Sequence, residues 1–168
     1  MTMTDLKVEK VTVNVGVGET GDRLQKAKKV IERITGRTAA LTKARQREQV
    51  FKIRKGDTIG AKITLRGEEA TEFLKRAFDA VDLQLNSRSI DKLGNFAFGI
   101  REYIDFPGAK YYPTIGIIGF DIDVTMVRPG RRVMLRRRKK STLPLRHRVK
   151  PDETIEFLTK NFKVNVYE

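Results

Sequence analysis

Hydrophobic and polar residues alternate in several short stretches of the chain, and this pattern predicts β-strands. In the stretch from Lys10 to Val15, valines at every second position alternate with polar side chains. A period of two places the valines on one face of a sheet and the polar residues on the other. The predicted strands are Lys10–Val15, Thr42–Arg45, a strand with Ala61, Ile63 and Leu65 that ends at Gly67, Phe96–Ile104, Ile115–Val127 and Lys163–Tyr167.

Three other stretches repeat their apolar residues at helical spacing. The pattern predicts helices over Asp22–Thr35, Glu68–Val81 and Asp152–Asn161, each with a single apolar face. Gly36 is well placed to end the first helix in a left-handed conformation. One-sided helices combined with alternating strands are typical of an α+β fold. We therefore expect one two-layer domain over residues 1–168, with helices on one face of a mainly antiparallel sheet and the other face open.

The first strand leads into the motif Gly16-x-Gly18-x-x-Gly21 and then a helix, as in dinucleotide-binding proteins. The strand argues against that class, because a parallel Rossmann strand is buried on both faces and Asn14 breaks its apolar run. The acidic residue expected about 20 residues later is also missing, since TAALTKAR occupies that place. We expect Gly16 and Gly18 to bring main-chain N–H groups close to phosphate near a helix N-terminus. A plain strand-to-helix turn is the alternative.

Positive charge is concentrated in one segment. The formal net charge of the 168 residues is +14, and Arg128–Lys150 contains 11 Lys and Arg with no acidic residue, which leaves +3 for the rest. Pro129, Gly130 and Pro144 argue against a long helix there. We name residues 128–150 the basic arm and expect it to order on RNA; a solvated, flexible charge run is the alternative.

The open face of the predicted sheet and the hairpin between its second and third strands are also basic. The open face is expected to carry Thr12, Asn14, Lys43, Arg45, Lys62, Thr64 and Arg66. The hairpin loop, Gln46–Gly56, mixes Arg47, Lys52, Arg54 and Lys55 with Phe51. Cations next to an exposed aromatic residue can hold phosphates and stack on a base. A solvated hairpin with Phe51 packed against the body is the alternative.

Two smaller features have competing interpretations. The pair Asp121-x-Asp123 has the spacing of metal ligands on a strand, but no histidine or third carboxylate is near in sequence, which favours a solvated strand face. Tyr111 and Tyr112 lie in the loop Phe106–Pro113, where packing over the sheet end is favoured over stacking on nucleotides.

The composition predicts no catalytic site, metal or cofactor. The chain has no cysteine and one histidine, His147, so thiol chemistry, disulfides and a histidine pair are excluded. No apolar run approaches the roughly 20 residues of a membrane helix, and the start MTMTDLKVEK does not have the pattern of a signal peptide. We expect a cytoplasmic, non-enzymatic protein with an anionic partner and no membrane contact.

Ordered blocks along nearly the whole chain resemble the large-subunit ribosomal protein L-five family. The blocks are VNVGVGE at Val13–Glu19, TKAR at Thr42–Arg45, FKIRKG at Phe51–Gly56, IGAKITLRG at Ile59–Gly67, FLKRAFDAVD at Phe73–Asp82, GNFAFGI at Gly94–Ile100 and IDFPGAKYYPTIGIIGFDIDV at Ile104–Val124. The basic arm and the short amino terminus resemble the archaeal or eukaryotic branch more than the bacterial one.

The resemblance implies a structural protein of the large ribosomal subunit that binds 5S rRNA and helps anchor it in the central protuberance. The residues implied for 5S rRNA are Asn14, Gly16, Gly18, Lys43, Arg45, Lys62, Thr64 and Arg66. The family's hairpin loop approaches P-site tRNA, which here implies Arg47, Phe51, Lys52, Arg54 and Lys55. A contact to a small-subunit protein is also implied, without assignable residues.

For the basic arm we expect contacts to 23S rRNA or 5S rRNA. The residues expected to make them are Arg128, Arg131, Arg132, Arg136, Arg137, Arg138, Lys139, Lys140, Arg146 and Arg148. Two other functional classes stay open at this point: a general non-ribosomal RNA-binding protein or RNA chaperone, and a nucleic-acid-modifying enzyme. The enzyme would need a metal or cofactor site, and the chaperone would not distinguish 5S rRNA from other RNAs.

Overall fold

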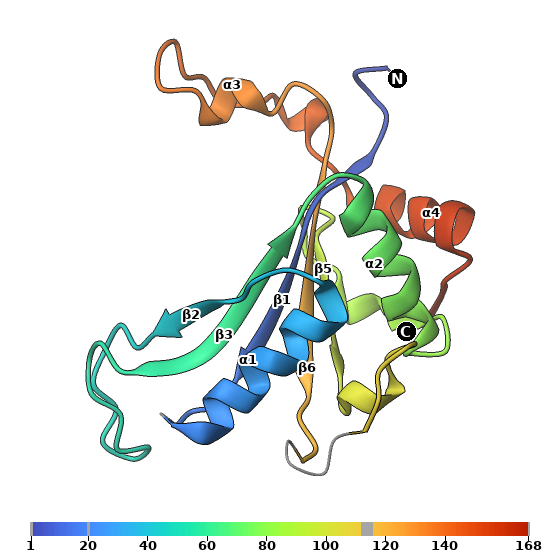
Figure 1. The fold of residues 1–168 in the computed structure, drawn as a ribbon. Coiled ribbons are helices and arrows are strands. Elements are labelled where there is room, and N and C mark those ends of the chain that lie inside the picture. The colour runs from blue at the N-terminus through green and yellow to red at the C-terminus, as the bar shows by residue number, and fades with distance from the viewer. Residues whose placement is uncertain (1, 20, 112–115, 168) are drawn as a thin grey trace. The chain divides into compact units, whose positions relative to one another are not determined.

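The computed structural model describes residues 2–19, 21–111 and 116–167 (Figure 1). Its helices are α1 (Asp22–Thr35), α2 (Glu68–Asp79), α3 (Arg132–Leu135) and α4 (Pro151–Phe162). Its strands are β1 (Lys7–Gly16), β2 (Ala40–Lys43), β3 (Thr58–Leu65), β4 (Gln84–Asn86), β5 (Phe96–Ile100), β6 (Phe120–Val127) and β7 (Asn165–Tyr167). Short 3₁₀ turns cover Ser87–Ser89, Tyr103–Asp105 and Leu145–His147.

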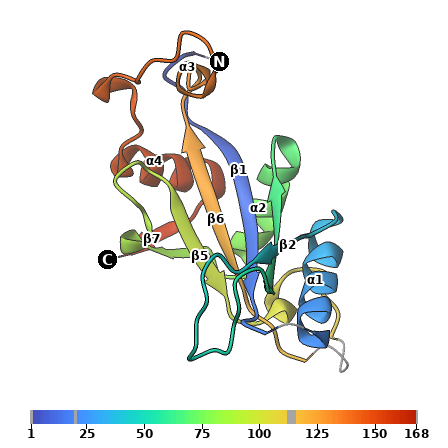
Figure 2. The ribbon, with the colours of Figure 1, turned by 90° about the vertical axis from the view of Figure 1, so that its left-hand side faces the viewer.

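Five of these strands form one sheet in the order β2-β3-β1-β6-β5, and β4 and β7 pair in parallel as a second, small sheet (Figure 2). The α+β class and the mainly antiparallel character of the large sheet are confirmed. The chain divides into two compact units, the first made of Met1–Val11, Arg66–Ala97 and Val124–Glu168, and the second of Thr12–Leu65 and Phe98–Asp123. That residues 1–168 behave as one domain stays a prediction.

In the second unit, helix α1 packs on strand β3 through one apolar face. The buried residues of α1 are Leu24, Ala27, Val30, Ile31 and Ile34, as the helical spacing predicts. The helix ends at Gly36, whose left-handed backbone (φ 70°) lets its N–H donate to the carbonyl of Glu32. Because α1 covers one face of β3, the alternate residues of that strand are left on the opposite face.

In the first unit, helices α2 and α4 meet around a cluster of aromatic rings. The ring of Phe78 on α2 lies 6.1 Å from the ring of Phe96 and 5.4 Å from that of Phe162 at the end of α4. Phe73, Leu74 and Phe78 are buried, which confirms that the aromatic face of α2 belongs to the core.

Several predicted boundaries need correction. The second strand is Ala40–Lys43 and not Thr42–Arg45, so Arg45 lies beyond its end. Helix α2 ends at Asp79, β5 ends at Ile100, and β6 begins at Phe120. The connection Asp82–Asn95, for which the sequence pattern predicts no helix or strand, contains β4, which pairs in parallel with β7. The sequence could not show this pairing, because the two strands have three residues each and are separated by the basic arm and α4.

Candidate nucleic-acid interface

The face of β1 and β3 opposite helix α1 is polar and accessible. On β3, Lys62 and Thr64 are exposed, while Ala61, Ile63 and Leu65 are buried. On β1, Thr12 and Asn14 are half-buried between the fully buried Val11, Val13 and Val15. Lys62 and Thr64 thus lie on the uncovered face of the sheet, as the alternation predicts. We call this uncovered surface of the second unit the open face.

A break in strand pairing adds Lys43 to the open face. The β2–β3 register pairs Ala40 with Lys62 and Thr42 with Gly60, and then shifts between Thr42 and Lys43 so that Lys43 pairs with Thr58. Paired residues share a face, and Thr58 has the same parity as Lys62. A β-bulge of this kind redirects one side chain. Arg45 is exposed outside the strand, and Arg66 is exposed in the first unit, directly after the end of β3.

The glycine turn after β1 differs from the expectation in its hydrogen bonds. The main-chain N–H groups of Val17 and Gly18 both donate to the carbonyl oxygen of Ile59, at 3.0 Å each. The N–H groups of Val17 and Gly18 are therefore already bonded within the protein, and the approach of this turn to phosphate stays a prediction. Open space does surround both glycines, because a Cβ atom at Gly16 or Gly18 would have no neighbour within 4 Å.

The hairpin loop projects from the second unit (Figure 2), and its aromatic residue is exposed. The side chain of Phe51 is 69% exposed, so the alternative in which it packs against the body is wrong. An isolated β-bridge between Glu48 and Ile53 closes the tip of the loop. Its cationic residues Arg47, Lys52, Arg54 and Lys55 are all exposed. Exposed cations and an exposed aromatic ring are the groups that hold phosphates and stack on bases.

The structure brings the hairpin loop and the glycine turn together. A hollow of about 370 Å³ is lined by residues of both, with Gly18 and Glu19 on one side and Phe51, Lys52 and Ile53 on the other. The sequence placed these segments more than thirty residues apart and gave no sign of this neighbourhood. A nucleic acid that reached the loop would therefore meet the glycine turn as well.

The open face also carries two carboxylates, which the sequence analysis did not assign to it. Asp121 and Asp123 are exposed on β6, and they alternate with the buried Phe120, Ile122 and Val124. Asp121 lines a shallow hollow with Asn14, Gly99 and Arg101. Asp123 is exposed by surface area, but partial desolvation of its carboxyl group raises its pKa, and the neighbouring charge of Asp121 raises the pKa further. The alternation along β6 places both residues on the face opposite its buried residues, but only the strand order shows that β6 lies next to β1.

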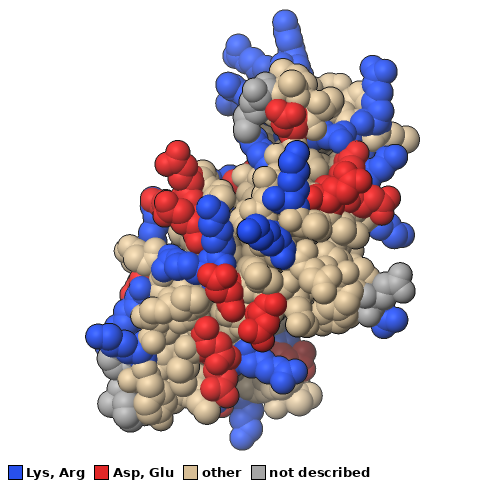
Figure 3. Space-filling view, turned by 90° about the vertical axis from the view of Figure 1, so that its right-hand side faces the viewer, with Lys and Arg blue, Asp and Glu red and all other residues tan. Residues whose placement is uncertain are grey.

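The basic arm, residues 128–150, carries two kinds of cation. Its only α-helix is the four-residue α3, which confirms that the arm has no long helix. Blue Lys and Arg side chains project outward at the top of Figure 3, the end at which Figure 1 places the arm. Most of the arm's cations are exposed, namely Arg132, Arg136, Arg137, Arg138, Lys139, Lys140, Arg146, Arg148 and Lys150. Arg128 and Arg131 instead form ion pairs with Glu153 and Glu9.

Within residues 2–19, 21–111 and 116–167, no three His, Cys, Asp or Glu side chains are grouped to hold a metal ion. No helix in these ranges has the length and apolar character needed to cross a membrane. Tyr111 is 57% exposed rather than packed over the sheet, and Tyr112 lies outside the described residues.

Comparisons with known proteins identify a family of ribosomal proteins. Two models of the ribosomal protein L5 family cover most of the chain: "Ribosomal protein L5" matches residues 2–54, and the model of the family's C-terminus matches residues 58–165. The chain is 48% identical to large ribosomal subunit protein uL5 of Sulfolobus acidocaldarius over 99% of its own length and 93% of that protein. It is 51% identical to the uL5 of Methanococcus vannielii, over 95% of the chain and 90% of that protein.

These findings define the class as a structural, non-enzymatic protein of the large ribosomal subunit. The chain belongs to the ribosomal protein L5 family, and the relatives named above are archaeal. Its surroundings are therefore rRNA and other ribosomal proteins in the cytoplasmic ribosome. The resemblance in the ordered sequence blocks is confirmed.

Proposed function

We propose that this protein binds 5S rRNA through the open face of the second unit and helps anchor that RNA in the central protuberance. The observation that carries the proposal is the set of polar and cationic side chains on the uncovered face: Asn14, Lys43, Lys62 and Thr64. Cations there would neutralise phosphates, and Asn14 and Thr64 would donate and accept hydrogen bonds with ribose and base edges.

Four residues around this face complete the proposed 5S rRNA site. Gly16 and Gly18 leave room for a backbone to approach, and Arg45 and Arg66 are exposed cations at the ends of β2 and β3. With the N–H of Gly18 already bonded to Ile59, the glycine turn contributes through its lack of side chains and not through a free amide of Gly18.

The hairpin loop serves a different RNA in this proposal. Arg47, Phe51, Lys52, Arg54 and Lys55 approach P-site tRNA, with Phe51 exposed for stacking on a base or a ribose. The exposed cations of the basic arm bind 23S rRNA or 5S rRNA phosphates. A further contact joins the protein to a small-subunit protein.

A competition titration tests the 5S rRNA assignment. Labelled 5S rRNA is bound to the protein and displaced by unlabelled 5S rRNA or by a shuffled RNA of equal length, at several salt concentrations. A preference for 5S rRNA that persists at physiological salt is expected, because a shaped surface adds contacts that charge alone does not supply. Equal displacement by both RNAs, lost together as salt rises, would instead identify a general RNA-binding protein or chaperone.

A further inference from the structure

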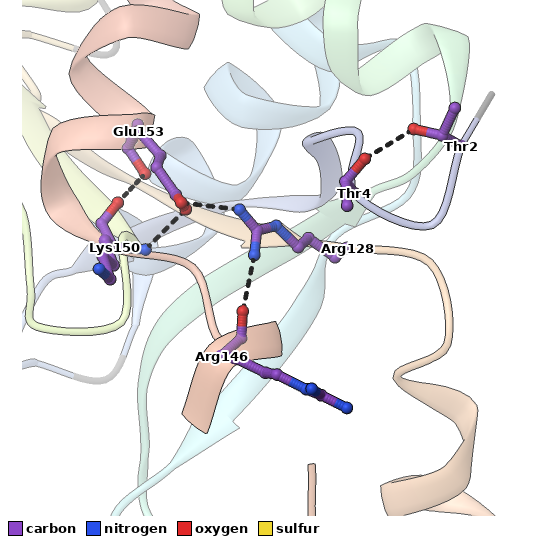
Figure 4. A network of polar contacts seen from close by, with 7 residues as sticks. Thr2, Thr4, Arg128, Arg146, Lys150 and Glu153 are labelled. Atoms are coloured by element: carbon purple, nitrogen blue, oxygen red, sulfur yellow. Dashed lines mark hydrogen bonds and ion pairs between the residues drawn. The ribbon is translucent and has the colours of Figure 1, made fainter. Parts of the chain in front are cut away.

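The first residue of the basic arm is fastened to the body by its guanidinium group. The side chain of Arg128 is only 13% exposed, and its Nη2 lies 2.8 Å from Oε1 of Glu153 on helix α4 (Figure 4). Its Nη1 donates to the main-chain carbonyl oxygen of Arg146, at 3.3 Å. One side chain therefore joins the outgoing part of the arm, the returning part of the arm and the helix that follows it.

Two further contacts close the base of the arm. Arg131 pairs with the carboxylate of Glu9 on strand β1. The Nε2 atom of His147 lies 2.8 Å from the carbonyl oxygen of Pro129, so this ring nitrogen carries the proton and donates. The segment that leaves β6 and the segment that enters α4 are thus held to one another as well as to the first unit.

The carboxylate of Glu153 has a second bond that fixes its position. Its Oε2 accepts a hydrogen bond from the main-chain N–H of Lys150, at 3.1 Å, at the start of α4. The helix start therefore orients the carboxylate that holds Arg128. A partner fixed in this way loses less side-chain entropy when the ion pair forms.

Beyond this base, the arm turns back sharply while carrying like charges. The main-chain N–H of Ser141 donates to the carbonyl of Val133 at 3.2 Å, and Nε of Arg136 donates to the carbonyl of Lys139 at 2.7 Å. Arg136–Lys140, five consecutive exposed cations, lie at this turn. Their mutual repulsion favours an open, mobile arm unless the ends are held.

We propose that Glu9 and Glu153 are positioning residues for rRNA binding, because they hold both ends of the basic arm and so present its exposed cations to phosphates in one geometry. This inference rests on the proposed role of the arm in binding rRNA. It assigns Arg128 and Arg131 to holding the arm and leaves phosphate contacts to the exposed cations beyond them. A loop fixed before binding loses less conformational entropy on binding, which raises affinity without a new contact.

The proposal and simple charge attraction predict opposite effects on RNA binding when Glu9 or Glu153 is replaced. Replacing Glu9 or Glu153 by Gln removes a negative charge from a protein that binds a polyanion. By Coulomb attraction alone, each substitution should strengthen RNA binding. If the carboxylates position the arm, each substitution should weaken it.

The first measurement is hydrogen exchange in the free protein, for Glu9→Gln, Glu153→Gln and the double variant. Amides of residues 132–146 are expected to exchange several-fold faster than in the wild type, because local opening of the arm becomes easier. Glu156→Gln is the matched control, since Glu156 lies on the same helix as Glu153 and the charge change is identical. Unchanged exchange in the Glu9 and Glu153 variants overturns the proposal, whatever RNA the arm binds.

The second measurement is competition for the ribosome. Wild-type protein and a variant, distinguished by isotope labels, compete for large subunits from which this protein has been removed. The Glu9→Gln and Glu153→Gln variants are expected to be incorporated about three- to tenfold less than the wild type, the range expected when a side chain or loop must be ordered on binding. Glu156→Gln should match or exceed the wild type. Enrichment of the Glu9 and Glu153 variants would show that only their charge matters.

Exchanging the charges of one pair tests whether the ion pair itself, and not either residue alone, is responsible. In the double variant Glu9→Arg with Arg131→Glu, the pair is reversed and the net charge is unchanged. Incorporation should recover relative to Glu9→Gln, whereas no recovery would show that the contact between Glu9 and Arg131 is not the cause. Should 5S rRNA show no preference in the titration described above, the exchange data still decide whether Glu9 and Glu153 hold the arm, because they need no RNA.

Discussion

The hydroxyl of Thr154, which is completely buried, donates a hydrogen bond of 3.0 Å to the main-chain carbonyl oxygen of Gly94. The contact joins helix α4 to the turn before β5, sixty residues earlier in the chain. A residue with a side chain does not fit at position 94, because the backbone there is left-handed (φ 73°) and a Cβ atom would lie 2.5 Å from Oγ1 of Thr154. This pair ties the start of α4, where Glu153 lies, to the core of the first unit.

Substitution of Thr154 by Val should therefore lower the free energy of unfolding by about 1–2 kcal/mol, because the shape is kept while the buried carbonyl of Gly94 loses its donor. The midpoint of urea denaturation measures the change. Thr159→Val is the matched control. Thr159 is exposed on the same helix, and its hydroxyl bonds only to oxygens of nearby residues, so its substitution should change stability by less than about 0.5 kcal/mol. Equal midpoints for the two variants would contradict the role given to Thr154.

The hairpin loop allows a test that separates two RNAs. Reversing the charges of Lys52, Arg54 and Lys55 to Glu should leave 5S rRNA binding nearly unchanged and weaken the retention of P-site tRNA on assembled ribosomes by about tenfold or more, because phosphate contacts are lost. Filter binding of labelled tRNA to reassembled ribosomes gives the retention, and the titration of the free protein gives 5S affinity.

Arg23, Lys26 and Lys29, all reversed to Glu, form the control for the hairpin variant. They are exposed cations on helix α1, whose other side covers β3. This control should not lower tRNA retention. If the hairpin variant lost 5S rRNA binding instead, our assignment of the loop to P-site tRNA would be wrong.

Local patterns were sufficient to predict most elements and the faces of the sheet. The bounds of α1, the buried side of β6 and the exposure of Lys62 follow from periodicity, because each depends on whether a side chain meets the core. The register between paired strands cannot be predicted from periodicity. The shift that places Lys43 opposite Thr58 depends on how two strands align, and the residues on either side of a bulge look like an ordinary strand in the sequence.

The sequence also could not show which residues far apart along the chain form ion pairs. All 11 cations of the basic arm look equivalent along the chain, yet Arg128 meets Glu153 and Arg131 meets Glu9, 122 residues away. Only the folded chain distinguishes a cation held by a carboxylate from one that faces solvent. For the same reason the sequence could not predict that Gly18 and Phe51 line one hollow, because hydrophobic periodicity carries no information on which loops meet.

The two lysines that the β2–β3 pairing places on the open face provide a test of the sheet. The double variant Lys43→Ala with Lys62→Ala should reduce 5S rRNA affinity and lower the slope of log affinity against log salt by up to about two units, one for each lost phosphate contact. Lys26→Ala with Lys29→Ala carries the same charge change on the exposed side of α1 and should leave the slope nearly unchanged. Equal slopes for the two double variants would place Lys43 and Lys62 away from phosphate.

Asp123 gives the second unit a dependence of stability on pH. Burial, and then the charge of Asp121, raise the pKa of Asp123 above its ordinary value of 3.8, so the folded state favours the neutral carboxyl group. A pKa that is raised in the folded state contributes stability that is fully present below 3.8 and is lost as pH rises through the raised value. Asp123→Asn keeps this side chain neutral at every pH. It should therefore be more stable than the wild type at pH 7, and this advantage should shrink as pH falls toward 4.

Urea midpoints of Asp123→Asn and the wild type at both pH values measure this difference. Asp105→Asn, at an exposed carboxylate of the same unit, corrects for the loss of one negative charge from a basic protein. The two effects are separable, because the general charge repulsion added to a protein of net charge +14 is common to both variants, whereas the desolvation that raises the pKa belongs to Asp123. An advantage of Asp123→Asn over Asp105→Asn that is the same at pH 4 and pH 7 would show that the carboxyl group of Asp123 is not destabilised by its place on β6.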